Sequence, residues 1–150
     1  MTLKPEKPEF FKDQITINSD LYVSTTNGVE VAVRPEFLDS QSSLIGEVFV
    51  WAYHVRIENK SNDTVQLISR YWKIVDARGL VQEVSGEGAV GEKPILPPGG
   101  VFEYTSGVHL RFHSGIMSGH YTMKKATGEF FEVKIPAFSL DTPNLKDTIN

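Results

Sequence analysis

The stretch with the most distinctive chemistry is residues 86–91, GEGAVG, whose glycines have the G-x-G-x-x-G spacing of a dinucleotide-binding loop. In such a loop a strand leads through the glycines into a helix, and the first amides of that helix face the pyrophosphate. Residues 80–85 could form the strand, but the chain continues as EKPILPPGG, and three prolines in this short space exclude the helix. We therefore predict that the loop binds no dinucleotide, and that Gly86 or Gly88 has a positive φ because of a tight turn.

A glycine-rich loop can still bind an anion, because successive backbone amides form a small concave site without any helix. Basic side chains that could join such a site are Arg70, Arg78 and Lys93. The sequence therefore leaves open weak binding of phosphate, pyrophosphate or a nucleotide, or of a carboxylate from a partner protein. The candidate ligand- or partner-binding residues are Gly86, Glu87, Gly88, Gly91, Arg70 and Trp72.

Arg70 and Trp72 are two positions apart in an apolar run, so they share one strand face and the guanidinium can lie near the indole ring. Such a pair could anchor a peptide or a nucleotide base. It could equally be a structural pair on the outer face of a sheet, packed under a loop. We favour the structural interpretation, because a central strand that bears a tryptophan is normal in β-sandwiches.

Metal binding and catalysis have little support in the residue types. The chain has no cysteine and its histidines are dispersed, so we expect neither a metal nor a cofactor. The strands that carry His54 and His109 would be neighbours, which leaves a two-histidine surface site as the less favoured alternative. No G-x-S-x-G or other nucleophile motif accompanies the serines and histidines, and we expect no enzymatic activity.

The elements that must position these residues are strands, because the apolar residues alternate with polar ones. The alternation is clearest in residues 47–58, where the apolar positions are Phe49, Trp51, Tyr53, Val55 and Ile57. Similar runs recur between turn sequences such as PPGG at 97–100. Together they predict an all-β fold, an antiparallel β-sandwich of the immunoglobulin or fibronectin type III kind with about seven to eight strands. We predict that four of the aromatic and apolar side chains lie buried between the two sheets: Trp51, Tyr53, Val55 and Tyr121.

Two finer predictions concern single positions in this pattern. Residues 65–76 are apolar at both odd and even positions, which predicts a central strand covered on both faces. Tyr121 stands near the start of a late strand, where the tyrosine of a tyrosine corner is found.

Composition restricts the partners and the compartment. The 150-residue chain has a net charge of −4, which disfavours nucleic acid as the main partner. It contains no apolar run that would serve as a secretory signal or insert into a membrane, so we expect a cytoplasmic protein. We expect residues 1–20 to be a flexible arm, residues 21–143 to form the sandwich domain and residues 144–150 to be a flexible tail.

Three long runs between about residues 28 and 143 are distinctive in combination. They read VWAYHVRIENKSNDTVQLISRYW, then RYWKIVDARGLVQEVSGEGAVGEKPILPPGGVFEYTSG, and finally GIMSGHYTMKKATGEFFEVKIPAFSL. With these runs the chain strongly resembles the ApaG family. The resemblance implies a fibronectin-type sandwich, an association with cobalt and magnesium resistance or efflux in bacteria, and use as a protein-interaction module in F-box and polymerase-interacting proteins. We therefore expect a non-enzymatic module whose partner is another protein, with small-anion or nucleotide-polyphosphate binding at residues 86–91 as the alternative.

Overall fold

The computed structural model describes residues 21–143, so the arm and tail predicted at the two ends lie outside the described residues. The described part is almost entirely strand, joined by tight turns and one short 3₁₀ turn. The elements are β1 (Tyr22–Thr26), β2 (Val29–Phe37), η2 (Asp39–Gln41), β3 (Phe49–Asn59), β4 (Val65–Asp76), β5 (Val81–Glu87), β6 (Ile95–Leu96), β7 (Val101–Leu110), β8 (Ser114–Lys125) and β9 (Phe130–Asp141).

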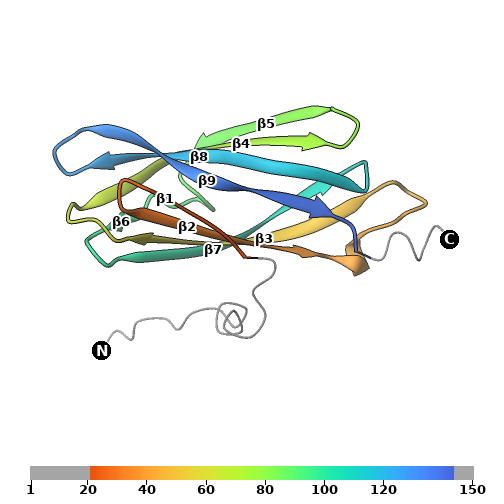
Figure 1. The fold of residues 1–150 in the computed structure, drawn as a ribbon, viewed down its shortest axis with the longest axis horizontal. Helices are drawn as coiled ribbons and strands as arrows, with labels where there is room; N and C mark the ends of the chain where they lie inside the picture. The colour runs from red at the N-terminus through yellow and green to blue at the C-terminus, as the bar shows by residue number, and fades with distance from the viewer. Residues whose placement is uncertain (1–20, 144–150) are drawn as a thin grey trace.

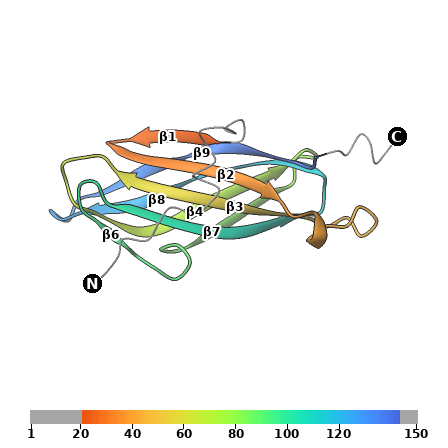
Figure 2. The same ribbon diagram turned by 90° about the horizontal axis from the view of Figure 1, so that it is seen from below.

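The strands form two sheets that pack face to face, which confirms the predicted antiparallel β-sandwich (Figures 1 and 2). One sheet has the order β1-β2-β3-β7. The other has the order β5-β4-β8-β9, and the short β6 pairs with the first residues of β4. Every neighbouring pair is antiparallel.

The core lies between the sheets and is formed by the alternating apolar positions of both. Trp51, Tyr53 and Val55 of β3 and Tyr121 of β8 are all buried, as their alternation predicts. The intervening side chains of β3, such as His54 and Arg56, lie on its other face and are only half-buried. The period of two in the sequence therefore assigns the faces of this strand correctly.

The expectation that β4 is covered on both faces is wrong. Its core face carries Val65, Leu67, Trp72 and Ile74, whereas Lys73 on the opposite face is exposed. The reason is a register shift between Leu67 and Ser69, where β4 has one residue more than its neighbour β8. This bulge moves the core face from the odd to the even positions, so the strand reads as apolar on both faces although it buries only one.

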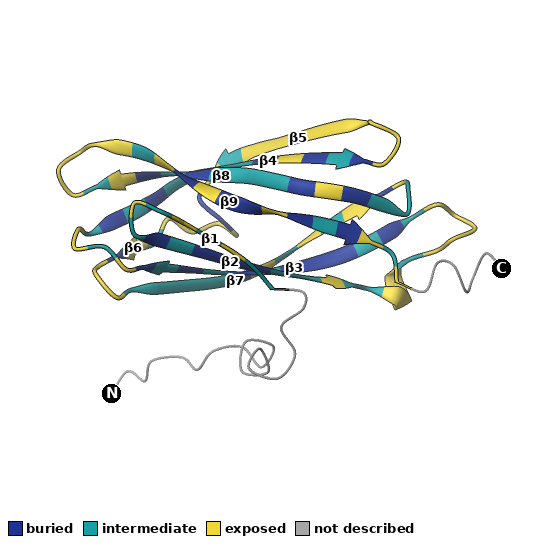
Figure 3. Cartoon of the chain, in the orientation of Figure 1, coloured by how far each residue is buried: buried dark blue, intermediate teal, exposed yellow. Residues whose placement is uncertain are grey.

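The two sides of the sandwich, where the edge strands of the two sheets meet, differ from each other. On one side β1 lies along β9, and the two sheets are joined there by hydrogen bonds, from Ser24 Oγ to the Lys134 carbonyl (2.8 Å) and from the Lys134 amide to Thr26 Oγ1 (3.1 Å). On the other side the edge strands are β5 and β7, and across the described residues no hydrogen bond joins them. Figure 3 shows β5 exposed along nearly its whole length. The sandwich is therefore closed along β1 and β9 and open along β5 and β7.

Candidate functional site

A cleft opens between the two sheets on the side of β5 and β7, and we call it the β5–β7 cleft. It consists of two adjoining hollows of about 240 and 330 Å³, which share the side chains of Ile74, Gln82 and His109. The first hollow has an apolar wall and a polar end. The wall consists of Ile74, Val84, Val108 and Met117, and the polar end consists of Tyr53, Arg70, Trp72 and Ser106.

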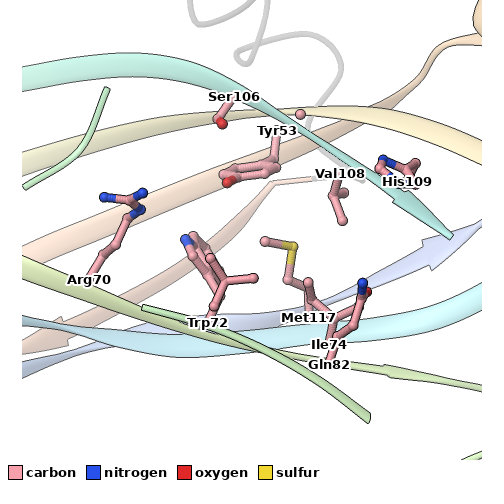
Figure 4. Close-up of a pocket in the computed structure, with 11 residues that line it drawn as sticks. Tyr53, Arg70, Trp72, Ile74, Gln82, Ser106, Val108, His109 and Met117 are labelled. Carbon is pink, nitrogen blue, oxygen red and sulfur yellow. The ribbon is translucent and has the colours of Figure 1, made fainter. Parts of the chain in front are cut away.

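The polar end brings four donor groups together from three strands (Figure 4). The Trp72 indole nitrogen, the Tyr53 hydroxyl, the Ser106 hydroxyl and the Arg70 guanidinium all lie at the same end of the hollow. Tyr53 and Ser106 face each other directly in the β3–β7 register. The bulge in β4 turns Arg70 and Trp72 toward them.

Trp72 belongs to the core, which corrects its favoured placement as an outer-face residue. Its side chain is only 1% exposed and packs edge-on against Tyr53, with ring centroids 5.2 Å apart. Its Nε1 nitrogen is buried, and within residues 21–143 it has no hydrogen-bond acceptor. A buried donor without a partner is uncommon in a folded protein, so this nitrogen is a group to which an incoming acceptor could bind.

Arg70 closes the same end of the cleft and is held by the glycine-rich loop. Its Nη1 donates to the carbonyl oxygens of Glu87 and Gly88, both at 3.0 Å. The guanidinium lies so close to Gly86 that a Cβ there would stand 2.9 Å from both terminal nitrogens. Within the described part of the chain, Arg70 forms no ion pair with a carboxylate.

Three buried tyrosines lie close enough to the Arg70 guanidinium to be affected by its charge. Burial raises the pKa of Tyr53, Tyr104 and Tyr121, while the positive charge of Arg70 acts on each of the three pKa values in the opposite direction. The three phenols are therefore neutral hydrogen-bonding groups at neutral pH. Arg70 is the group that contributes charge to this end of the cleft.

The glycine-rich loop is a tight turn, as the prolines after it predict. Gly88 has a φ of +59°, and its amide donates to the Ile68 carbonyl at 2.8 Å. The turn is closed by two hydrogen bonds between Ala89 and Glu92, each 2.9 Å, with Val90 and Gly91 both at positive φ between them. The chain then enters the short strand β6, and no helix follows. The loop thus lacks the helix of a dinucleotide site, and its glycines serve the backbone geometry and the close approach of Arg70.

The basic residues proposed for an anion site do not all meet at the loop. Arg70 lies against Gly86, and Lys93 pairs with the exposed Glu87 at 2.9 Å. Arg78 instead pairs with Asp76 at the opposite end of the β4–β5 hairpin. The amides of Gly88, Ala89 and Glu92 already donate to carbonyl oxygens of the chain, so these three are not available to an anion.

The histidines also lie apart, although the strands of His54 and His109 are neighbours as predicted. In the register of β3 and β7, His54 faces Thr105 and His109 faces Val50. His54 contacts Thr105 Oγ1 and Glu36 Oε1 with its two ring nitrogens, each at 2.8 Å. No group of three or more potential metal ligands occurs among residues 21–143.

The sequence indicated only half of the cleft. Arg70 and Trp72 were candidates, but Ser106, Val108, Met117 and Gln82 carried no signal that would connect them to the site. They come from β5, β7 and β8 and meet because β5 and β7 form the open edges of opposing sheets. The run EYTSG, which includes Ser106, stood out only as one of the distinctive sequence runs.

The fold and the cleft define a small antiparallel β-sandwich domain, with no helix in its described part that is long and apolar enough to cross a membrane. The ApaG domain family matches residues 39–125, and the chain belongs to this family. Protein ApaG of Rhodospirillum centenum is 56% identical over 124 residues, which are 83% of this chain and 95% of that protein. Protein ApaG of Parvibaculum lavamentivorans is 55% identical over 126 residues, 84% of this chain and 97% of that one.

A solved structure has the same fold. The crystal structure of the putative ApaA protein from Bordetella pertussis superposes with a TM-score of 0.74 at 42% sequence identity. The match covers 81% of this chain and 96% of the Bordetella chain.

Proposed function

We propose that the protein is a non-enzymatic interaction module that binds an extended segment of a partner protein along β5, over the β5–β7 cleft. The observation that supports this most is the open edge of the second sheet. All residues of β5 are exposed except the half-buried Gly86, and the outer edge of the strand has no hydrogen-bonded neighbour among the described residues. An edge strand of this kind offers unpaired backbone groups to which another chain can add a strand.

The sequence of β5 supports the same interpretation. Natural edge strands are often protected by proline or by charged side chains, lysine above all. The strand β5 (VQEVSGE) contains no lysine or proline, and its charged residues are Glu83 and Glu87. Its Val81 and Val84 are 48% and 43% exposed, and Val84 lines the cleft. An added strand would cover these valines and place alternate side chains toward the cleft, which gives a binding segment both affinity and specificity.

An interaction role also fits the chemistry that the site offers. No serine–histidine hydrogen bond occurs in residues 21–143, and the histidines do not gather into a metal site. The association with cobalt and magnesium resistance that the family resemblance implies would then act through the partner, in the cytoplasm. Binding of a small anion by the glycine-rich loop has less support, because the loop amides are largely occupied and Arg78 lies elsewhere.

The test is affinity capture from a cell lysate with the full chain and two matched variants, followed by mass spectrometry. Val84→Lys places a charge on the open edge strand, and Val23→Lys places the same charge on β1, where Val23 is 50% exposed but the side of the sandwich is closed by β9. We expect a specific protein to be retained by the wild type and by Val23→Lys and to be lost with Val84→Lys. Retention by all three chains would contradict binding at β5.

A further inference from the structure

We propose that the polar end of the β5–β7 cleft binds a carboxylate, carried by an acidic residue of the partner segment whose aliphatic part packs on the apolar wall. This inference rests on the proposed function, because it specifies the chemistry of the segment that β5 would bind. It is carried by the two groups at the polar end whose interactions are incomplete, Trp72 and Arg70.

The indole of Trp72 requires an acceptor. Its Nε1–H can only donate, and leaving a buried donor without a partner is unfavourable because the group loses its hydrogen bond to water on burial. Among the groups that a partner could bring, a carboxylate oxygen is the strongest acceptor, whereas a lysine or arginine would add further donors. Trp72 is 1% exposed and lines the hollow together with Arg70, so an acceptor bound in the hollow would lie beside both side chains.

Arg70 supplies the charge that selects an anion. Two carbonyl oxygens hold its Nη1 in place, and the glycine at position 86 lets the guanidinium lie flat against the backbone of β5. A guanidinium held in this way is pre-organised, so that little side-chain entropy is lost when a carboxylate pairs with it. None of the described side chains that line this hollow is acidic, so residues 21–143 provide no competing carboxylate there.

The remaining surroundings limit the size and nature of the group. Tyr53 and Ser106 add two neutral hydroxyl groups near Arg70 (Figure 4). The apolar wall of the hollow is formed by Ile74, Val84, Val108 and Met117. A hollow of about 240 Å³ has room for a carboxylate with a short aliphatic body. An amphiphilic hollow of this kind favours an acid with an apolar stem over a fully hydrated inorganic anion, because the stem buries apolar surface.

Nuclear magnetic resonance of the two tryptophan indoles provides the test. The chain has two tryptophans, Trp51 and Trp72, so a ¹⁵N-labelled sample gives two indole N–H signals, which Trp72→Phe assigns. The probe is 4-methylpentanoate, with 4-methylpentanamide as the uncharged probe of the same shape and inorganic phosphate as a third. We expect the acid to shift the Trp72 signal and leave that of Trp51, which is buried outside this hollow, unchanged.

The variants identify the group that recognises the charge. Arg70→Gln should weaken binding of the acid by on the order of tenfold, which is the effect of losing one charge-assisted hydrogen bond. Arg78→Gln removes an arginine that does not line this hollow and is paired with Asp76 at the turn of the β4–β5 hairpin, so it should not change binding of the acid. The amide should bind weaker than the acid by a similar factor.

Three results would overturn the carboxylate site: no shift of the Trp72 signal, equal shifts with acid and amide, or a stronger response to phosphate. The outcome separates this inference from the proposed function. If 4-methylpentanoate does not shift the Trp72 signal while Val84→Lys still abolishes partner capture, the carboxylate site is wrong and the proposed function stands. If the acid binds while capture is unaffected by Val84→Lys, the cleft binds carboxylates and the strand-addition function is wrong.

Discussion

The hydroxyl groups of Tyr104 on β7 and Tyr121 on β8 are hydrogen-bonded to each other in the interior, so this bond connects the two sheets. Both side chains are buried, and burial raises the pKa of both phenols. A tyrosine corner would instead direct the Tyr121 hydroxyl to a nearby backbone group. The placement of Tyr121 as a tyrosine corner is therefore wrong, and its hydroxyl serves a contact between the sheets.

Tyr121→Phe should destabilise the fold by about 1–3 kcal/mol, because it leaves the Tyr104 hydroxyl buried without this partner. The double variant Tyr104→Phe, Tyr121→Phe should lose less unfolding free energy than the two single variants lose in sum, since it removes both polar groups. Urea denaturation of the four proteins measures this coupling. Strictly additive effects would show that the two hydroxyls contribute independently.

Trp51→Ala should lower the free energy of unfolding by about 3–5 kcal/mol, as large aromatic truncations in a core do. Trp51 is 2% exposed and packs edge-on against Phe37, with ring centroids 5.3 Å apart. The control is Ile45→Ala, a truncation of a side chain that is 98% exposed and should change stability by no more than about 0.5 kcal/mol. A loss below about 1 kcal/mol for Trp51→Ala in urea would contradict its place in the core.

Gly88→Ala should destabilise the protein more than Gly79→Ala, although both glycines have a positive φ. At Gly79, with φ +93°, a Cβ would meet nothing within 4 Å, so the cost is the conformational strain of about 1 kcal/mol. At Gly88 a Cβ would overlap the carbonyl oxygen of Glu92, and the turn that holds Arg70 must shift. Thermal denaturation of the two variants measures the difference, and equal losses would show that the turn adapts freely.

Protonation of Asp76 should make the protein less stable in acid. Its pKa is lowered first by the hydrogen bond from Arg78 (2.9 Å) and further by the amides of Leu80 and Arg78, while its own desolvation opposes the shift. A carboxyl whose folded pKa lies below its unfolded value of about 3.9 contributes stability above that value and loses it as the pH falls through the folded pKa. Unfolding free energies should therefore fall as the pH drops below about 4, less steeply in Asp76→Asn than in the wild type. Identical acid profiles would contradict this role.

We expect the purified protein to retain no stoichiometric cobalt or zinc after dialysis. A tight site needs three or four ligands, and the structure keeps His54 and His109 apart in the β3–β7 register. Metal analysis of the wild type, His54→Ala and His109→Ala tests this. Cobalt retained by the wild type and lost from either variant would establish the two-histidine site instead.

Sequence alone determined the fold class and the backbone geometry of the glycine-rich loop, because both follow from local rules. Alternation in β3 assigns Trp51, Tyr53 and Val55 to the core, since successive side chains of any strand point to opposite faces. The prolines after Gly91 exclude a helix wherever the loop lies, because the restriction belongs to the proline ring itself. The loop sequence predicts a positive φ at Gly86 or Gly88, and the structure has it at Gly88.

Only the tertiary structure decided which of these residues meet. One extra residue in β4 reverses the faces after Leu67 and turns Arg70 and Trp72 inward, and a bulge of this kind leaves no clear mark in the alternation. The pairing of Tyr104 with Tyr121, the separation of His54 from His109 and the open side between β5 and β7 depend on strand order and register. These are contacts between residues distant in the sequence, which form because whole sheets bury their apolar faces against each other, and no local pattern specifies them.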